Sequence, residues 1–254
     1  MRFSLLLAVI LAGVAPPVAF GDEVRVAVAA NFAGPAQKIA ADFERKTGNT
    51  VLLSIGSTGK FYAQIRNGAP YEVLLAADSD TPARLQVEHL AVAGTRITYA
   101  IGKLVLWSPR PDVVDPHGDV LRTGHFSHLA IANPVLAPYG MAAMQTLRSL
   151  GLYDRLRDRI VQAENIGQAF QFVASGNAEL GFVALSQIDD GGRLREGSQW
   201  LVPESMYSPL AQDAVLLQPG RGSAAAKSFL VWLNGPGPRA VIRSYGYELP
   251  GAAQ

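Results

Sequence analysis

The feature that most constrains the fold is a regular alternation of short apolar runs with helical segments. Residues 24–30, 50–55 and 72–76 are rich in Val, Leu, Ile and Ala and are expected to be strands, whereas 36–46, 59–66 and 82–89 have helical patterns. Gly48 and the pair Asn67-Gly68 end the first two helices. Strands that are apolar throughout and alternate with helices are typical of a parallel sheet covered on both faces. The pattern therefore predicts an α/β fold.

The same alternation continues through the middle and the end of the chain. Strands are expected at residues 100–107, 129–132, 159–162, 180–184 and 214–217, and helices at 140–150, 167–175, 224–234 and 238–245. A chain of 254 residues is long enough for two domains. No flexible linker separates them, so two α/β units joined by strands predict a hinged pair of lobes with a cleft between them. We expect lobe 1 to contain residues 22–102 and 205–254, and lobe 2 to be the inserted segment 103–204.

The N-terminal 21 residues have the pattern of a secretory signal peptide. Arg2 is followed by an almost unbroken apolar run over residues 3–14, by two prolines, and by small residues at the two positions that a signal peptidase reads, Ala19 and Gly21. The run is too short to span a bilayer. We expect residues 1–21 to be cleaved and the mature chain to be exported to the periplasm; an uncleaved N-terminal anchor is the alternative. No cysteine follows the run, which argues against a lipid anchor.

Charge and cysteine content exclude several classes of function. The chain has 22 basic and 21 acidic residues, and Arg2 is the only charged residue of the predicted leader, so the mature part is close to neutral. Neutrality argues against a nucleic-acid partner or an anionic membrane surface, because both favour a basic face. The chain has no cysteine, which excludes disulfides, thiol chemistry and thiolate metal sites.

Four places where a predicted strand gives way to a helix carry small or hydroxyl residues. In an open α/β sheet, ligands bind beyond the carboxyl ends of strands, and the unpaired N–H groups of a helix start can hold an anion without any cationic side chain. Asn31, Ser57, Thr58 and Tyr139 could add side-chain donors, and Ile166 a backbone N–H. Each polar residue has a simpler interpretation as a helix N-cap, and Tyr139 as a buried aromatic. The four places are Ala30-Asn31, Ser57-Thr58, Pro138-Tyr139-Gly140 and Asn165-Ile166-Gly167.

Several short motifs, in order along nearly the whole mature chain, resemble the molybdate-binding proteins of bacterial importers. They include residues 29–32 (AANF), 56–60 (GSTGK), 72–79 (EVLLAADS), 137–140 (APYG), 164–166 (ENI) and 181–183 (GFV). The resemblance implies a two-lobed type II periplasmic-binding fold and a monomer that binds molybdate or tungstate by neutral hydrogen bonds and delivers it to the membrane permease of an ABC importer. It implies no cofactor and no enzymatic activity.

The resemblance also places the ligand contacts, all of them to the oxygens of the oxyanion and none to the metal itself. In lobe 1 the contacts fall on Asn31 and on the pair Ser57-Thr58, and in lobe 2 on Tyr139 and Ile166. One departure concerns Ala184, which stands where many members have a ligand-binding tyrosine. Tyr139 stands where those members have alanine, so we expect its phenol to replace the missing hydroxyl.

Other motifs suggest different chemistry, but their patterns are incomplete. The segment 56–60 lacks the glycine spacing and the Ser or Thr after Lys60 that a nucleotide P-loop needs. His125 and His128 have helical spacing but no third metal ligand, and Asp78 is more simply a helix N-cap. A binding protein for another small anion such as sulfate, an exported enzyme on the same scaffold and an exported sensory domain remain as alternatives. Lys60 is expected to point into solvent, and Glu164 to orient its loop.

Overall fold

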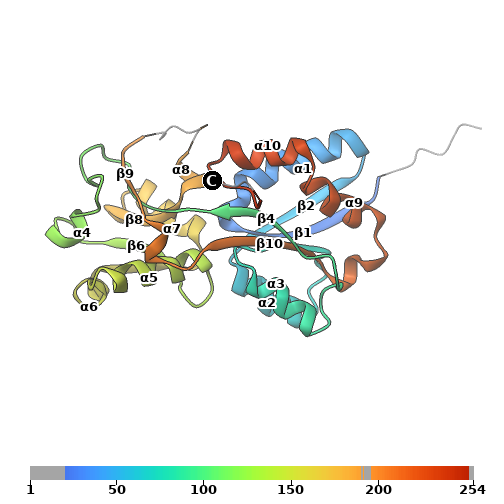
Figure 1. Ribbon diagram of the computed structural model, residues 1–254, viewed down its shortest axis with the longest axis horizontal. Coiled ribbons are helices and arrows are strands. Elements are labelled where there is room, and N and C mark those ends of the chain that lie inside the picture. The colour runs from blue at the N-terminus through green and yellow to red at the C-terminus, as the bar shows by residue number, and fades with distance from the viewer. Residues whose placement is uncertain (1–20, 190, 192–195, 252–254) are drawn as a thin grey trace, which may run out of the picture.

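The computed structural model describes residues 21–189, 191 and 196–251, and it contains two lobes, each built around a five-stranded sheet (Figure 1). The predicted α/β class with two lobes is confirmed. Residues 1–20, which form nearly all of the predicted signal peptide, lie outside the described residues. Within the described part of the chain, no helix combines the length and the apolarity needed to cross a bilayer.

The first sheet has the strand order β2-β1-β3-β10-β4. Its strands β2, β1 and β3 are parallel, and Val28 of β1 lies opposite both Ile55 and Leu75. β10 runs antiparallel to β3 and to β4, so the sheet is mixed rather than wholly parallel. The strands are β1 (Glu23–Ala29), β2 (Thr50–Gly56), β3 (Val73–Leu75), β4 (Ile97–Gly102) and β10 (Leu210–Leu216).

Helices cover both faces of the first sheet because its strands are apolar on both sides. Val26 and Leu75 belong to a core cluster with the helices on one face, and Ala27 and Leu74 to a cluster with those on the other. Figure 1 shows α1, α9 and α10 above the sheet and α2 and α3 below it. The helical elements are η1 (Ala30–Phe32), α1 (Ala33–Thr47), α2 (Thr58–Arg66), α3 (Asp80–Val87), η4 (Gln218–Gly222), α9 (Ala224–Leu233) and α10 (Pro236–Ser244).

The second sheet repeats the plan with the order β7-β6-β8-β5-β9. β6 is parallel to β7 and β8, whereas β5 is antiparallel to β8 and β9. α5 packs on one face and α7 on the other. The elements are β5 (Leu104–Ser108), α4 (Val120–Thr123), β6 (Leu129–Ala132), α5 (Pro138–Ser149), α6 (Tyr153–Leu156), η2 (Arg157–Arg159), β7 (Ile160–Ala163), α7 (Ile166–Ala174), β8 (Leu180–Ala184), α8 (Leu185–Ile188), β9 (Ser198–Leu201) and η3 (Glu204–Met206).

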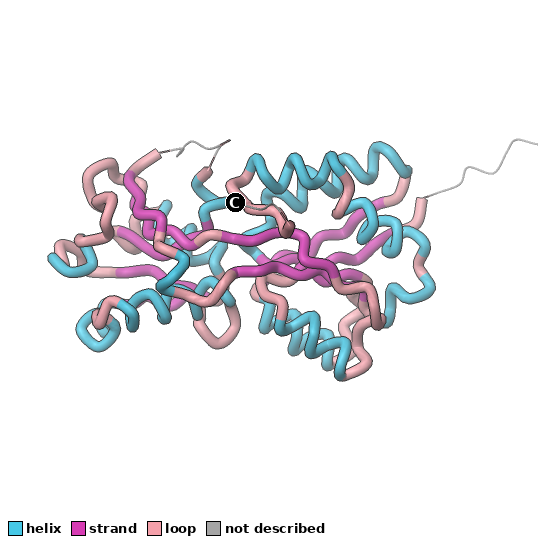
Figure 2. Tube along the Cα trace, viewed as in Figure 1, coloured by secondary structure: helices cyan, strands magenta, loops and turns pink. Residues whose placement is uncertain are grey.

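Two segments cross between the lobes, and they lie side by side at the crossing because Gly102 pairs with Leu210 (Figure 2). The predicted strand 100–107 is wrong as a single element: the chain leaves the first sheet after Gly102 and enters the second at Leu104. The other segment leads through residues 202–209 into β10, which begins four residues earlier than predicted. The strand β9 was not predicted, because its polar residues Ser198 and Gln199 hide the apolar pattern.

Candidate functional site

A small cavity lies where five chain segments from the two lobes meet, and four of them are helix starts. All five residues expected to contact a ligand line it, together with small and apolar neighbours, and none of the lining residues carries a charge. Its volume is about 10 Å³, which is close to the least space that one water molecule needs. The lobes are therefore closed around this point. The lining residues are Ala29, Ala30, Asn31, Gly56, Ser57, Thr58, Ala77, Ala137, Pro138, Tyr139, Asn165 and Ile166.

Each of the four segments follows the carboxyl end of a parallel strand and begins a helix. β1 leads into η1 and α1, β2 into α2, β6 into α5, and β7 into α7. The first N–H groups of a helix have no partner within it, and the aligned peptide dipoles make this end partially positive. Four such ends around one uncharged cavity form a site for a small anion.

Ser57 supplies the clearest unpaired donor of the site. It occupies the N-cap position of α2, but its side chain makes no capping hydrogen bond. Its hydroxyl oxygen is buried without any hydrogen-bond partner, and the residue is only 2 % exposed. Buried hydroxyls are normally paired, so the Ser57 hydroxyl is available to donate to a ligand. The N-cap interpretation holds instead for Asn165, whose Oδ1 accepts from the backbone N–H of Gln168 at 3.0 Å.

Thr58 is also buried, and its hydroxyl holds the neighbouring strand end in place. The Thr58 Oγ1 accepts a hydrogen bond of 3.0 Å from the backbone N–H of Ala77. A hydroxyl that accepts one hydrogen bond still has its own proton to donate. Thr58 can therefore support the loop after β3 and donate to a ligand at the same time.

Asn31 lines the cavity, but its side-chain amide is hydrogen-bonded to other residues of the protein. Its Nδ2 donates to Gln212 Oε1 and to the phenol oxygen of Tyr247, each at 2.9 Å. An amide nitrogen has two protons, and both are used. In this closed arrangement, the hydrogen-bond donor that Asn31 has left for a ligand is its backbone N–H in η1.

Tyr139 reaches the cavity from the second lobe as the second residue of α5. It is 1 % exposed, and its phenol oxygen accepts a hydrogen bond of 3.2 Å from Gln212 Nε2. Burial raises the pKa of Tyr139 well above its ordinary value of 10.0, so the phenol stays neutral and keeps its proton. Ala184 is buried at the end of β8 and is not among the lining residues, so the only phenol lining this cavity is that of Tyr139.

The sequence analysis missed three buried polar residues behind the cavity: Ser186, Gln212 and Tyr247. The hydroxyls of Ser186 and Tyr247 both lie 2.8 Å from the backbone oxygen of Asn31, and they lie 3.1 Å from one another. Ser186 belongs to α8 of the second lobe, so these bonds join the lobes. A signal was present in the sequence, since Gln212-Asp213 is a polar pair inside an otherwise apolar strand.

Two further contacts join the lobes close to the cavity. The backbone N–H of Gly59 donates to the backbone oxygen of Leu136 at 2.8 Å. The Lys60 Nζ lies 2.9 Å from Glu164 Oε1, and both side chains are about half exposed. Lys60 was expected to point into solvent, but the structure pairs it with a carboxylate of the other lobe.

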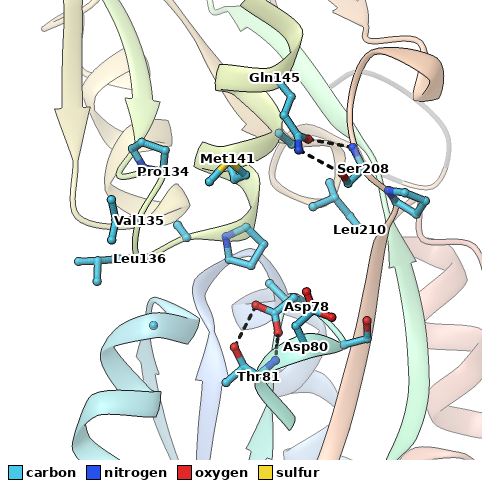
Figure 3. Close-up of a pocket in the computed structure, with 17 residues that line it drawn as sticks. Asp78, Asp80, Thr81, Pro134, Val135, Leu136, Met141, Gln145, Ser208 and Leu210 are labelled. Atoms are coloured by element: carbon cyan, nitrogen blue, oxygen red, sulfur yellow. Dashed lines mark hydrogen bonds between the residues drawn. The ribbon is translucent and has the colours of Figure 1, made fainter. Parts of the chain in front are cut away.

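A larger pocket of about 430 Å³ adjoins the cavity and shares Ala77, Ala137 and Pro138 with it. Figure 3 shows that Asp78 and Asp80 lie at this pocket across from Val135 and Leu136. The Asp78 carboxylate accepts from the backbone N–H and the hydroxyl of Thr81 at 2.8 and 3.2 Å. Two carboxyl groups and no cation among its lining residues make this pocket unsuited to an anion. No group of three or more His, Cys, Asp or Glu side chains in the described residues has the arrangement of a metal site.

Comparison with known proteins agrees with this geometry. The profile of the bacterial extracellular solute-binding proteins matches residues 24–248. A molybdate-binding protein of Azotobacter vinelandii is 52% identical over 98% of this chain and 100% of its own length. One from Rhodobacter capsulatus is 49% identical over 92% of this chain and 91% of its own length. The solved structure of the Azotobacter vinelandii periplasmic molybdate-binding protein superposes with a TM-score of 0.87 at 46% identity, covering 89% of this chain and 99% of that one.

Proposed function

The chain belongs to the family of bacterial extracellular solute-binding proteins, and we propose that it captures molybdate, or equally tungstate, for import. The observation that carries this proposal is the uncharged cavity at four helix starts, which is lined by Ser57, a residue whose buried hydroxyl has no hydrogen-bond partner. Relatives named as molybdate-binding proteins, about half identical over nearly the full length, supply the identity of the anion.

Neutral donors suit a fully ionised, tetrahedral dianion. Hydrogen bonds to a charged acceptor are stronger than those between neutral groups, and the low dielectric of a closed site strengthens them further. A protonated oxyanion such as hydrogen phosphate would bring a proton that needs an acceptor, which leaves a donor facing a donor. Sulfate has the same shape and charge as molybdate but is smaller. The cavity of about 10 Å³ has to widen to hold either anion, and we expect the widened site to fit molybdate better than sulfate.

The proposed contacts involve the residues expected from the sequence, and the donating group of each residue can now be named. Ser57 and Thr58 donate through their hydroxyls, and Tyr139 through its phenol. Asn31 and Ile166 donate through their backbone N–H groups, because the side chain of Asn31 is occupied and that of Ile166 is apolar. All of these atoms contact oxygens of the oxyanion, and none contacts the metal.

The transport cycle follows from the two lobes. We place the hinge at the two crossing segments, near Lys103 and in residues 202–209, with lobe 1 as residues 22–102 and 205–254 and lobe 2 as 103–204. The chain acts in the periplasm as a monomer after loss of residues 1–21, and it passes the anion to the membrane permease of an ABC importer. We propose no enzymatic step, because the relatives are named as molybdate-binding proteins. Glu164, the carboxylate nearest the four helix starts in the sequence, is paired with Lys60.

Isothermal titration of residues 22–254 with molybdate, tungstate, sulfate and phosphate tests this function. We expect tight one-to-one binding of molybdate and tungstate, with sulfate and phosphate bound at least about a hundredfold more weakly, a difference of about 2.7 kcal/mol. Preference for sulfate would assign the site to another anion. Absence of binding with all four would reject an oxyanion site, and organic anions would be the next ligands to titrate.

A further inference from the structure

Gln212 is hydrogen-bonded to two of the proposed ligand-binding residues, Asn31 of the first lobe and Tyr139 of the second. It is completely buried on β10, the strand that returns from the second lobe to the first. Its Oε1 accepts from Asn31 Nδ2 at 2.9 Å and from the phenol of Tyr99 at 3.1 Å. Its Nε2 donates to the phenol oxygen of Tyr139 at 3.2 Å.

The direction of these hydrogen bonds follows from the chemistry of the groups. Asn31 Nδ2 can only donate, so the atom of Gln212 that faces it must be the carbonyl oxygen. The amide nitrogen of Gln212 then faces Tyr139 and can only donate. The phenol oxygen of Tyr139 is thereby the acceptor of this bond. Its own proton remains available, either to the neighbouring phenol of Tyr247 or to an anion in the cavity.

The backbone next to Gln212 makes room for this contact. A Cβ at Gly102 would lie 2.1 Å from the phenol oxygen of Tyr139 and 2.6 Å from Gln212 Nε2. The register of β10 against β4 also shifts between Gln212 and Asp213, as at a β-bulge. Bulges re-aim side chains near functional sites, and here the shift lies beside the two crossing segments.

From this geometry we propose that Gln212 is a positioning residue that couples closure of the lobes to the presentation of donors. Gln212 holds the Asn31 side chain within the first lobe. When the lobes close, it meets the Tyr139 phenol of the second lobe, so that the phenol proton is directed to the anion. In an open form, Tyr139 would lose its contact with Gln212. This proposal rests on the proposed function, since it concerns the same site.

Replacement of Gln212 by methionine tests the proposal, because methionine has a similar volume and no hydrogen-bonding amide. We expect molybdate affinity in isothermal titration to fall about tenfold or more, the loss expected for a buried hydrogen bond. Thr146→Val is the matched control: it removes a buried hydrogen bond of 2.9 Å to Ala142 inside α5, away from the cavity. It should lower the melting temperature and leave affinity within about twofold of the starting protein.

A double-mutant cycle separates positioning from a general loss of stability. If Gln212 acts through the phenol of Tyr139, the effect of Gln212→Met on affinity should shrink to less than about threefold in a Tyr139→Phe background. An undiminished effect in that background would overturn the proposal. Unchanged molybdate affinity in Gln212→Met would also overturn the role proposed for Gln212, but it would leave the proposed function intact. If the starting protein binds no molybdate, both the proposed function and the role of Gln212 are rejected.

A second variant covers the case in which Gln212→Met does not fold. Gln212→Glu keeps an acceptor for Asn31 and Tyr99. Burial raises the pKa of the new carboxyl, and once ionised it cannot donate to Tyr139 and instead accepts the phenol proton. We expect this variant, at a pH above that raised pKa, to bind molybdate at least about tenfold more weakly than the starting protein. In the Tyr139→Phe background the loss should be smaller. Unchanged affinity in Gln212→Glu would contradict the proposal.

Discussion

The Nζ of Lys60 lies 2.9 Å from the Oε1 of Glu164, and this ion pair joins the first turn of α2 in the first lobe to the segment just before α7 in the second. Both residues sit beside helix starts that line the cavity, yet neither lines it. The pair therefore spans the two lobes at the edge of the closed site, and we expect it to break when the lobes open.

Lys60→Met and Glu164→Gln distinguish two roles of this pair. If it acts mainly as a bond between the lobes, each variant should weaken molybdate binding by about two- to fivefold, because exposed ion pairs are worth little. The double variant should then bind no worse than either single one. If the charges act mainly on the anion, Glu164→Gln should strengthen binding instead. We expect the first result, measured by titration at low and high salt, with the loss shrinking at high salt.

Ser57 and Thr58 are adjacent, but their substitution should have different consequences for stability. Ser57→Ala removes a hydroxyl that is buried without a partner, so the free protein should be as stable as before or slightly more stable. Thr58→Val removes the acceptor for the backbone N–H of Ala77 and should cost about 1–3 kcal/mol. Both should weaken molybdate binding about tenfold or more. Thermal melts of the free proteins together with titrations check both parts, and a destabilised Ser57→Ala would show that the hydroxyl has a structural partner.

Gly59 lies at the contact between the lobes, so a single methyl group there should oppose closure. A Cβ at Gly59 would lie 3.0 Å from both the Cα and the backbone oxygen of Leu136, across the interface. Gly59→Ala should fold normally, bind molybdate about tenfold or more weakly, and keep a larger radius of gyration with ligand in small-angle scattering. Gly237→Ala is the control, because nothing lies within 4 Å of its Cβ position, and it should close like the starting protein.

The sequence was sufficient to predict the features that depend on local pattern. Apolar strands such as 50–55 and 159–162 and the turns after them place Ser57 and Ile166 at helix starts, and the carboxyl ends of parallel strands gather these turns at one edge of each sheet. That the two edges face each other was implied by the resemblance and not by the pattern. The break at Lys103 could not be seen, because an apolar run looks the same whether it pairs in one sheet or passes from one sheet to another.

The polar contacts behind the cavity depend on residues far apart in the chain. Asn31 is separated by 181 residues from Gln212 and by 216 from Tyr247, so no local spacing reveals that its amide protons are already used. The same holds for Lys60, whose partner Glu164 is 104 residues away. Residue type alone marked Asn31 as a donor, and only the three-dimensional contacts show which of its atoms is left for a ligand.

Asp78 should make the stability of the protein depend on pH in the acidic range. Loss of solvation on burial raises the pKa of its carboxyl above the ordinary 3.8, and the charges of Asp80 and Asp213 add to the rise, although hydrogen bonds from Thr81 oppose it. A raised pKa means that the folded protein holds the proton more tightly than the unfolded chain does. Stability therefore falls as the pH rises from 3.8 through the raised value.

Asp78→Asn should remove that decline, because asparagine carries no charge to be desolvated. We expect the variant to melt at a higher temperature than the starting protein at neutral pH, with the difference closing as the pH falls toward 3.8.

Since Ala77, the residue that precedes Asp78, lines the anion cavity, loss of the negative charge in Asp78→Asn should also strengthen molybdate binding about threefold at neutral pH. Asp80→Asn, which removes a more exposed charge of the same pocket, is the control and should change affinity less. A variant that melts lower than the starting protein at neutral pH would show that the Thr81 hydrogen bonds to the ionised carboxylate outweigh its desolvation.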